Sequence, residues 1–175
     1  NAQSPTLDLE IGSAPSGATV GATVGVPISI VSDTLQPSAL LFFLEFDEMS
    51  LRFDDVLAGP AVPENKILDF RLLDGGDGGM ATVSMIVFGL DQVTIPDGVV
   101  FILRFEILDM GDNGIIPLTA IDASATTAGS NIQEIQVNAS DGAIDLTCNV
   151  LALPTNVQAS SDRTDGVRIT WAAVE

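Results

Sequence analysis

Hydrophobic and polar positions alternate with a period of two along much of this chain, the spacing that places side chains i and i+2 on one face of a β-strand. The alternating segments are short and are separated by Gly, Pro, Asp and Asn, which favour turns. No segment shows a convincing helical period. We therefore expect strands at residues 6–12, 23–31, 39–46, 51–56, 67–73, 82–88, 99–108, 116–125, 131–137 and 143–147. This succession predicts an all-β fold, a sandwich or jelly roll.

The segment 39–46 departs from simple alternation, because it is apolar on both faces. The even-numbered residues from Leu40 to Phe46 form one apolar row. The other row contains Leu41 and Phe43 before Glu45 restores polarity. Either both faces of this strand are buried, or one of them is a surface that contacts a partner.

The segment 99–108 can be oriented from its charges. Arg104 and Glu106 lie in one row, and charged side chains are rarely buried. The opposite row is therefore expected in the core; it consists of Val99, Phe101, Leu103, Phe105 and Ile107. In the segment 83–88, periodicity alone leaves open which row faces outward.

Composition narrows the possible functions. The chain has 175 residues, enough for one domain with a sizeable core. It contains 24 Asp and Glu against 6 Lys and Arg, a net charge of -18. Such a field repels phosphate backbones, so we expect no nucleic-acid partner. No apolar run is long enough to span a bilayer, so we expect no membrane insertion. The acidity itself is more typical of solubility or of adaptation to salt than of a binding device.

Catalysis receives little support from the sequence. The chain has no His and no Tyr, and its single cysteine, Cys148, has no histidine to activate it. One cysteine also excludes a disulfide framework within the chain. There is no phosphate-binding loop and no nucleophile elbow. We therefore expect no enzyme activity.

Two loops rich in Asp and Gly are weak candidates for calcium. One contains Asp74 and Asp77, and the other contains Asp109 and Asp112. Oxygen-rich loops with Gly at tight bends can bind calcium, but neither loop has the spacing or the terminal Glu of an EF-hand. Flexible hairpin turns explain the same residues and are the favoured interpretation. We therefore predict no metal site and no cofactor.

The residues after Cys148 have a different character. Residues 149–154 are expected to form a linker, followed by two strands at 155–160 and 165–171. With Pro154 before the first strand and Trp171 on the second, this part resembles the start of a fibronectin type III domain. Two strands cannot bury a core by themselves. The predicted organisation is a sandwich domain at 1–148, a linker at 149–154 and an incomplete fibronectin type III fragment at 155–175, as expected of a piece of a longer modular protein.

Four separated motifs in the first 148 residues resemble those of the cohesin domain. They are residues 21–28 (GATVGVPI), 42–47 (FFLEFD), 96–105 (PDGVVFILRF) and 140–144 (SDGAI). Each motif alone is little more than a turn beside a strand. Their order and spacing carry the resemblance.

The resemblance implies a nine-stranded jelly-roll sandwich that binds a calcium-loaded, helical dockerin module on a sheet made of strands 8, 3, 6 and 5. Matching 39–46 to the third strand, 83–88 to the sixth and 99–107 to the eighth gives the outward-facing residues of that sheet. The implied contact residues are Leu41, Phe43, Glu45, Ser84, Ile86, Phe88, Ile102 and Arg104. The resemblance also implies a secreted or cell-surface protein, with any polysaccharide association made through the parent protein.

The sequence departs from this pattern at two positions. The best-studied cohesins of the cellulosome have Asn and Asp on the third strand where this chain has Ala39 and Leu41. Loss of those hydrogen bonds favours a more apolar recognition mode, similar to that of type II cohesins.

Three alternatives remain open at this point. In the first alternative, the apolar patch is not a binding surface, because a loop, residues 61–73, a second copy of the chain or the fibronectin fragment covers it. Alternatively, the domain is a carbohydrate-binding module of similar fold, although it lacks the Tyr and Trp that usually stack on sugars. It is otherwise a structural spacer in a secreted adhesin.

Overall fold

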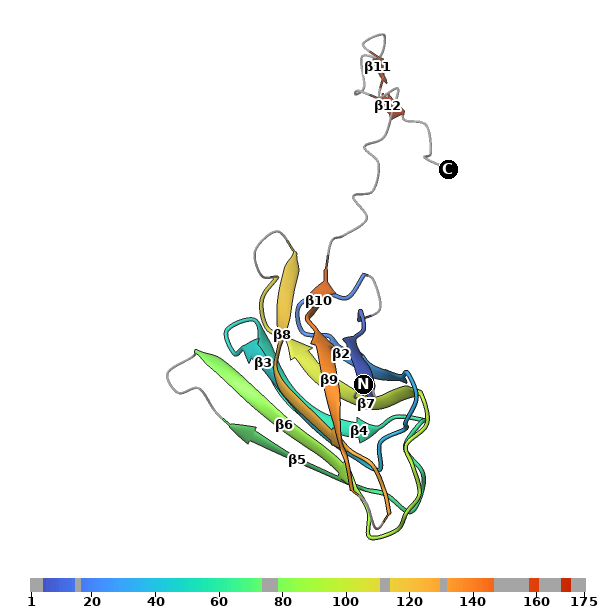
Figure 1. The fold of residues 1–175 in the computed structure, drawn as a ribbon. Helices are drawn as coiled ribbons and strands as arrows, with labels where there is room; N and C mark the ends of the chain where they lie inside the picture. Colours follow the sequence, from blue (N-terminus) through green and yellow to red (C-terminus); the bar gives the residue numbers. More distant parts are fainter. Residues whose placement is uncertain are drawn as a thin grey trace.

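The computed structural model describes residues 5–14, 17–73, 79–110, 114–129 and 132–146, together with the backbone of 158–160 and 168–170. The main body contains ten strands (Figure 1): β1 (Thr6–Ile11), β2 (Thr23–Ser32), β3 (Ala39–Asp47), β4 (Leu51–Ala58), β5 (Ile67–Leu73), β6 (Met80–Phe88), β7 (Gly98–Ile107), β8 (Ile115–Thr126), β9 (Glu134–Ser140) and β10 (Gly142–Asp145). The prediction of an all-β sandwich is confirmed. The main body has one strand more than the nine that the resemblance implied.

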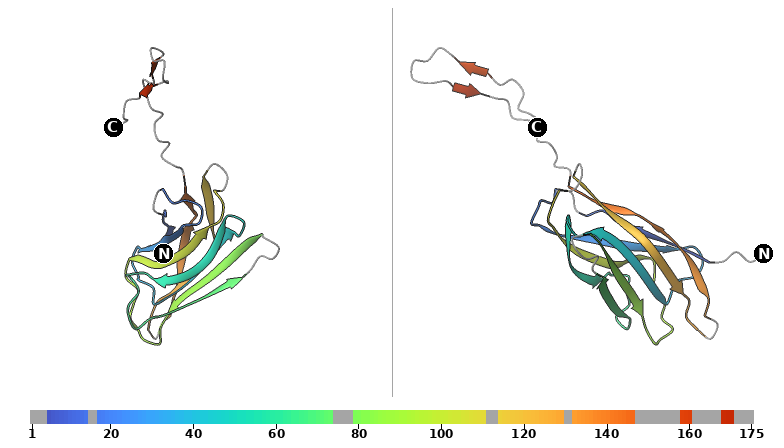
Figure 2. Two further views of the ribbon diagram at one scale, coloured as in Figure 1. Left: turned by 180° about the vertical axis from the view of Figure 1, so that it is seen from behind. Right: turned by 90° about the vertical axis from the view of Figure 1, so that its left-hand side faces the viewer.

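The strands form two layers joined along one side (Figures 1 and 2). One layer has the order β4-β7-β2-β1-β9 and the other has the order β8-β3-β6-β5. β9 runs parallel to β1 and also pairs with the end of β8, where Ala125 lies opposite Ile135. The hydrogen-bonded path is therefore continuous, and β4 and β5 are its two edge strands.

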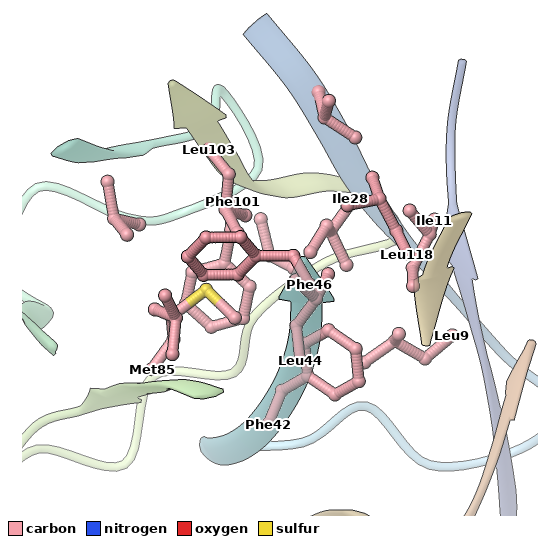
Figure 3. Close-up of a cluster of buried hydrophobic side chains, with 14 of the residues drawn as sticks. Leu9, Ile11, Ile28, Phe42, Leu44, Phe46, Met85, Phe101, Leu103 and Leu118 are labelled. Atoms are coloured by element: carbon pink, nitrogen blue, oxygen red, sulfur yellow. The ribbon is translucent and has the colours of Figure 1, made fainter. Parts of the chain in front are cut away.

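The core fills the space between the two layers. The inner row of β3 contains Phe42, Leu44 and Phe46, all with at most 1% of their surface exposed. Phe46 packs edge to face against Phe105 of β7, with ring centroids 5.0 Å apart. Figure 3 shows these side chains meeting others from β1, β2, β6 and β8. Aromatic rings contribute the largest buried areas of a core, so the inner row of β3 anchors its sheet onto the opposite layer.

The additional strand arises where the chain changes sheets. β9 pairs with β1 and β10 pairs with β8, and only Asp141 separates them. The Asp141 carboxylate accepts a hydrogen bond from the Ala120 backbone at 2.8 Å. At Gly142, a Cβ atom would lie 2.5 Å from the Ile11 side chain. Only glycine permits this close approach without a shift of the neighbouring atoms.

A β-bulge corrects one detail of the predicted core. Ile28 of β2 pairs with Phe101 and Ser29 pairs with Val99, so Val100 is an extra residue on β7. An extra residue interrupts the alternation of faces. As a result Val100 is fully buried, whereas Val99, which we expected in the core, is half-buried.

Beyond the main body, β11 (Gln158–Ser160) and β12 (Arg168–Thr170) pair in the antiparallel direction. This matches the two strands expected there, while their membership of a fibronectin type III domain stays a prediction. The linker at 149–154 lies outside the described residues. Within the described part, no helix is long and apolar enough to cross a membrane.

Candidate protein-binding face

The outer row of β3 lies at the centre of an open sheet surface. Leu41 is opposite Ile86 of β6 on one side and Ser124 of β8 on the other. Phe43 is opposite Ser84 and Asp122. Residues directly opposite one another share a face of the sheet. We call this outward surface of β8, β3, β6 and β5 the β3 face.

The edge strand β5 extends the same face. Ile67 lies opposite Phe88, Asp69 opposite Ile86, Arg71 opposite Ser84 and Leu73 opposite Thr82. Because the segment 67–73 is a strand of this sheet, it widens the face rather than covering it. Ile67 and Leu73 are 52% and 41% exposed.

Six of the eight predicted contact residues are brought together on the β3 face. They are Leu41, Phe43, Glu45, Ser84, Ile86 and Phe88. All six are half-buried, as expected of side chains packed against neighbours within a sheet. Their inward neighbours Leu40, Phe42 and Met85 are fully buried, which confirms the predicted orientation of both strands.

The other two predicted residues, Ile102 and Arg104, do not lie on this face. They belong to β7, which pairs with β2 and β4 in the opposite layer. Arg104 forms an ion pair with Asp54 of β4 at 3.2 Å. The expectation that residues 99–107 lie next to β3 is therefore wrong. Alternation identifies which side chains of a strand share a face, but it does not identify the neighbouring strand.

The strand that does lie beside β3 is β8, which sequence reasoning left out of the site. It contributes Thr119, Asp122 and Ser124 opposite the outer row of β3. A second bulge, between Phe43 and Leu44, leaves Ile121 as an extra residue of β8 with 51% exposure. The sequence contained a usable signal, because 116–125 is the eighth predicted segment and the resemblance implied that the eighth strand lies in the same sheet as the third.

Of the four candidate calcium residues in the acidic loops, Asp109 alone lies within the described residues. The Asp109 carboxylate accepts a hydrogen bond from the backbone of Met110 at 2.6 Å, as in an ordinary turn. Asp74, Asp77 and Asp112 lie outside the described residues. No cluster of three or more acidic, His or Cys side chains suited to a metal occurs within the described ranges.

A polar hollow of about 480 Å³ lies among the loops at one end of the strands, away from the β3 face. It is lined in part by Asp33 and Asp97. Hydrogen bonds from the Thr34 hydroxyl and the Thr6 backbone lower the pKa of Asp33. These bonds use the carboxylate to hold the turn after β2, so its role there is structural.

A buried lysine anchors the start of β5. The Lys66 side chain is fully buried, and its ammonium contacts the Asp91 carboxylate at 2.8 Å. The hydrogen bond from Lys66, with further bonds from Val93 and Asn65, lowers the pKa of Asp91. Since Lys66 directly precedes Ile67, this pair fixes the edge of the β3 face.

The sequence profile of the cohesin domain matches residues 7–146, which is most of the chain. The chain belongs to the cohesin domain family. No curated protein sequence matches it. The match covers the whole sandwich and ends at the close of β10.

Solved cohesin structures share this fold at low sequence identity. The seventh ScaB type I cohesin from Pseudobacteroides cellulosolvens is 21% identical with a TM-score of 0.64, and the match covers 82% of this chain and 93% of that one. The third ScaC cohesin from Acetivibrio cellulolyticus, solved in complex with the ScaB dockerin, is 22% identical with a TM-score of 0.61 and coverages of 82% and 100%. A non-cellulosomal cohesin from the archaeon Archaeoglobus fulgidus is 18% identical with a TM-score of 0.57 and coverages of 82% and 92%.

Proposed function

We propose that this cohesin domain is a non-catalytic module that binds a calcium-loaded dockerin on its β3 face. The observation that carries the proposal is a continuous row of apolar side chains on a sheet surface that the described residues leave uncovered. Exposed apolar patches bordered by polar groups are typical of protein-binding sites. Cohesins of the same fold have been solved in complex with dockerins.

The apolar row crosses three strands. It runs from Ile67 on β5 through Phe88 and Ile86 on β6 to Leu41 and Phe43 on β3. On β3 and β6, each residue of the row alternates with a buried neighbour that holds its strand in place. A helix laid across the strands would bury this row while its flanks met the polar side chains of β8 and β5.

We further propose that recognition is mainly apolar, as in type II cohesins. Ala39 and Leu41, the positions at which the resemblance implies a polar pair, both lie in the outer row of β3 opposite Thr126 and Ser124. Neither side chain can form hydrogen bonds. A partner that relies on polar contacts at these positions would leave its own polar groups unsatisfied, at a cost of about 1–3 kcal/mol for each group.

As a dockerin-binding module, the chain would act in a secreted or cell-surface protein assembled from several domains. The fibronectin-like segment after residue 154 supports this modular organisation. Calcium would be supplied with the dockerin, since the resemblance places the metal on the partner.

The proposal can be tested by retention of purified dockerins on the immobilised domain, in calcium and in EDTA. We expect at least one dockerin of a broad panel to bind in calcium and to be released by EDTA. The double variant Phe43→Asp with Phe88→Asp should reduce its affinity by at least a hundredfold, because charges replace two side chains in the apolar row.

The matched control is Ile102→Asp, on the outer face of the opposite layer. It should bind as the wild type does. Circular dichroism must show that the double variant is folded; unfolding would mean that Phe43 and Phe88 belong to the core and would contradict the proposed face. Binding of no dockerin, or retention on insoluble polysaccharide through the same face, would also contradict the proposal.

A further inference from the structure

The cations of the sandwich are distributed unevenly over its two faces. Among the described residues with side chains, Lys and Arg occur at four positions. Arg52, Lys66 and Arg104 each form an ion pair, with Glu106, Asp91 and Asp54 respectively. Arg71 is the remaining cation, and it lies on the β3 face opposite Ser84. Among the described residues, ion pairing therefore leaves the β3 face out.

The β3 face carries the carboxylates of Glu45, Asp69 and Asp122. Within the described part, no ion pair involves Glu45, Asp69 or Asp122. From the described residues, the Asp69 and Asp122 carboxylates each accept a hydrogen bond only from the next backbone amide, of Phe70 and Ala123. These carboxylates keep most of their capacity to accept hydrogen bonds, so they are available to donors on a partner.

The positions of these charges relative to the apolar row are defined by the register. Across the sheet, Asp122 of β8, Phe43 of β3, Ser84 of β6 and Arg71 of β5 are successive neighbours. With about 4.8 Å between strands, the negative end and the positive end of this line are about 14 Å apart. Glu45 lies two residues from Phe43 on β3, next to Thr119 of the same β8 strand that carries Asp122. The β8 side of the face therefore carries carboxylates, while the β5 side carries Arg71, the one described cation without an ion pair, together with Asp69 two residues away on the same strand.

We infer that the dockerin partner of this domain presents basic side chains to the β8 side of the face, near Asp122 and Glu45, and a carboxylate to Arg71. This inference rests on the proposed function and specifies the chemistry of the partner. Complementary charges around an apolar centre determine orientation and raise the association rate more than they raise affinity. A second copy of this chain is the less suitable occupant, because two bodies of net charge -18 repel each other.

The test uses a dockerin that the wild-type domain retains, with kinetics measured at 50 and 500 mM NaCl. Asp122→Lys should weaken binding at least tenfold at low salt, mainly through a slower association rate. Arg71→Glu should also weaken it. Glu10→Lys is the matched control, since it makes the same change in net charge on an exposed residue of β1 in the other layer.

Each outcome bears on a distinct claim. The charge inference would be overturned if Asp122→Lys and Glu10→Lys bound with equal affinity, or if the association rate of the wild type did not depend on salt. In either case, loss of binding in Phe43→Asp with Phe88→Asp would still support the proposed function. If the wild-type chain forms a dimer and Phe43→Asp makes it monomeric, the face serves self-association and the inference is overturned. Failure of the domain to bind any dockerin would overturn the function together with the inference.

Discussion

The two outer faces of the sandwich differ in how their charges are satisfied. On the β4-β7-β2 side, Arg52 pairs with Glu106 and Arg104 pairs with Asp54, all between adjacent strands of one sheet. On the β3 face, the carboxylates lie beside apolar side chains, without ion pairs among the described residues. Both described arginines of the β4-β7-β2 side are held in ion pairs, whereas Arg71, the described cation of the β3 face, forms none among the described residues.

This difference shows that net charge alone says little about where a very acidic protein binds. The surplus of negative charge is spread over both layers, and Asp8 and Glu10 lie on the outer side of β1. The binding candidate is distinguished instead by unpaired charge next to exposed apolar area. That combination is the anatomy of an interface, with an apolar centre and a polar rim.

The largest effect on the free energy of unfolding is expected on β3, where the inner row lies in the core and the outer row lies on the β3 face. Phe42→Ala should lower the free energy of unfolding by about 3–5 kcal/mol, because it removes a fully buried ring from between the layers. Phe43→Ala should cost about 1 kcal/mol, because that ring is only half-buried. Urea denaturation of both variants measures the difference. Equal losses would mean that the β3 face is covered, and the comparison of the two faces would fail.

A smaller effect is expected at the anchor of β5. Asp91→Asn should lower the melting temperature at pH 7, because it leaves the buried Lys66 ammonium without its anionic partner. The pKa of Asp91 is lowered in the folded protein. Its contribution to stability is therefore present above the ordinary aspartate pKa of about 3.9 and is lost as the pH falls through the lowered value.

The measurement for this pair is the melting temperature of both proteins between pH 2 and pH 7. The gap between wild type and Asp91→Asn should close at the acidic end of the range. A gap that stays constant with pH would show that the charge of Asp91 is not what holds β5 in place.

The smallest effect is expected at the ion pairs of the opposite face. Arg52→Ala and Arg104→Ala should each change the free energy of unfolding by about 0–1 kcal/mol, since both pairs are largely exposed to solvent. Neither variant should alter dockerin binding. Chemical denaturation and the retention assay check the two statements, and a binding defect in Arg104→Ala would place the interface on β7 instead.

The sequence was sufficient to predict most strands and the orientation of β3 and β6. Two apolar rows in 39–46 left one face without an explanation, and the outward positions of Leu41 and Phe43 agree with the structure. The sheet to which residues 99–107 belong was not predictable from alternation, because Ile102 faces outward in either layer. The burial of Val100 was not predictable either, because the bulge that causes it depends on the pairing with β2.

The polar half of the candidate site was missed for a related reason. Asp122 and Arg71 are ordinary surface residues in the sequence, and only the cross-strand register places them at the two ends of one line through Phe43. Register is a long-range property, because β3 and β8 are separated by more than sixty residues of chain. A local pattern contains no information about it.

The parallel pairing of β1 with β9 has a mechanical consequence. Five register pairs join these strands, from Thr6 with Gln136 to Glu10 with Ser140, and both strands run in the same direction. A pull on the chain before Thr6 against the chain after β9 would slide one strand along the other. Such a pull loads the hydrogen bonds between them together instead of opening them one after another. The two strands would therefore act as a clamp that resists tension applied along the chain.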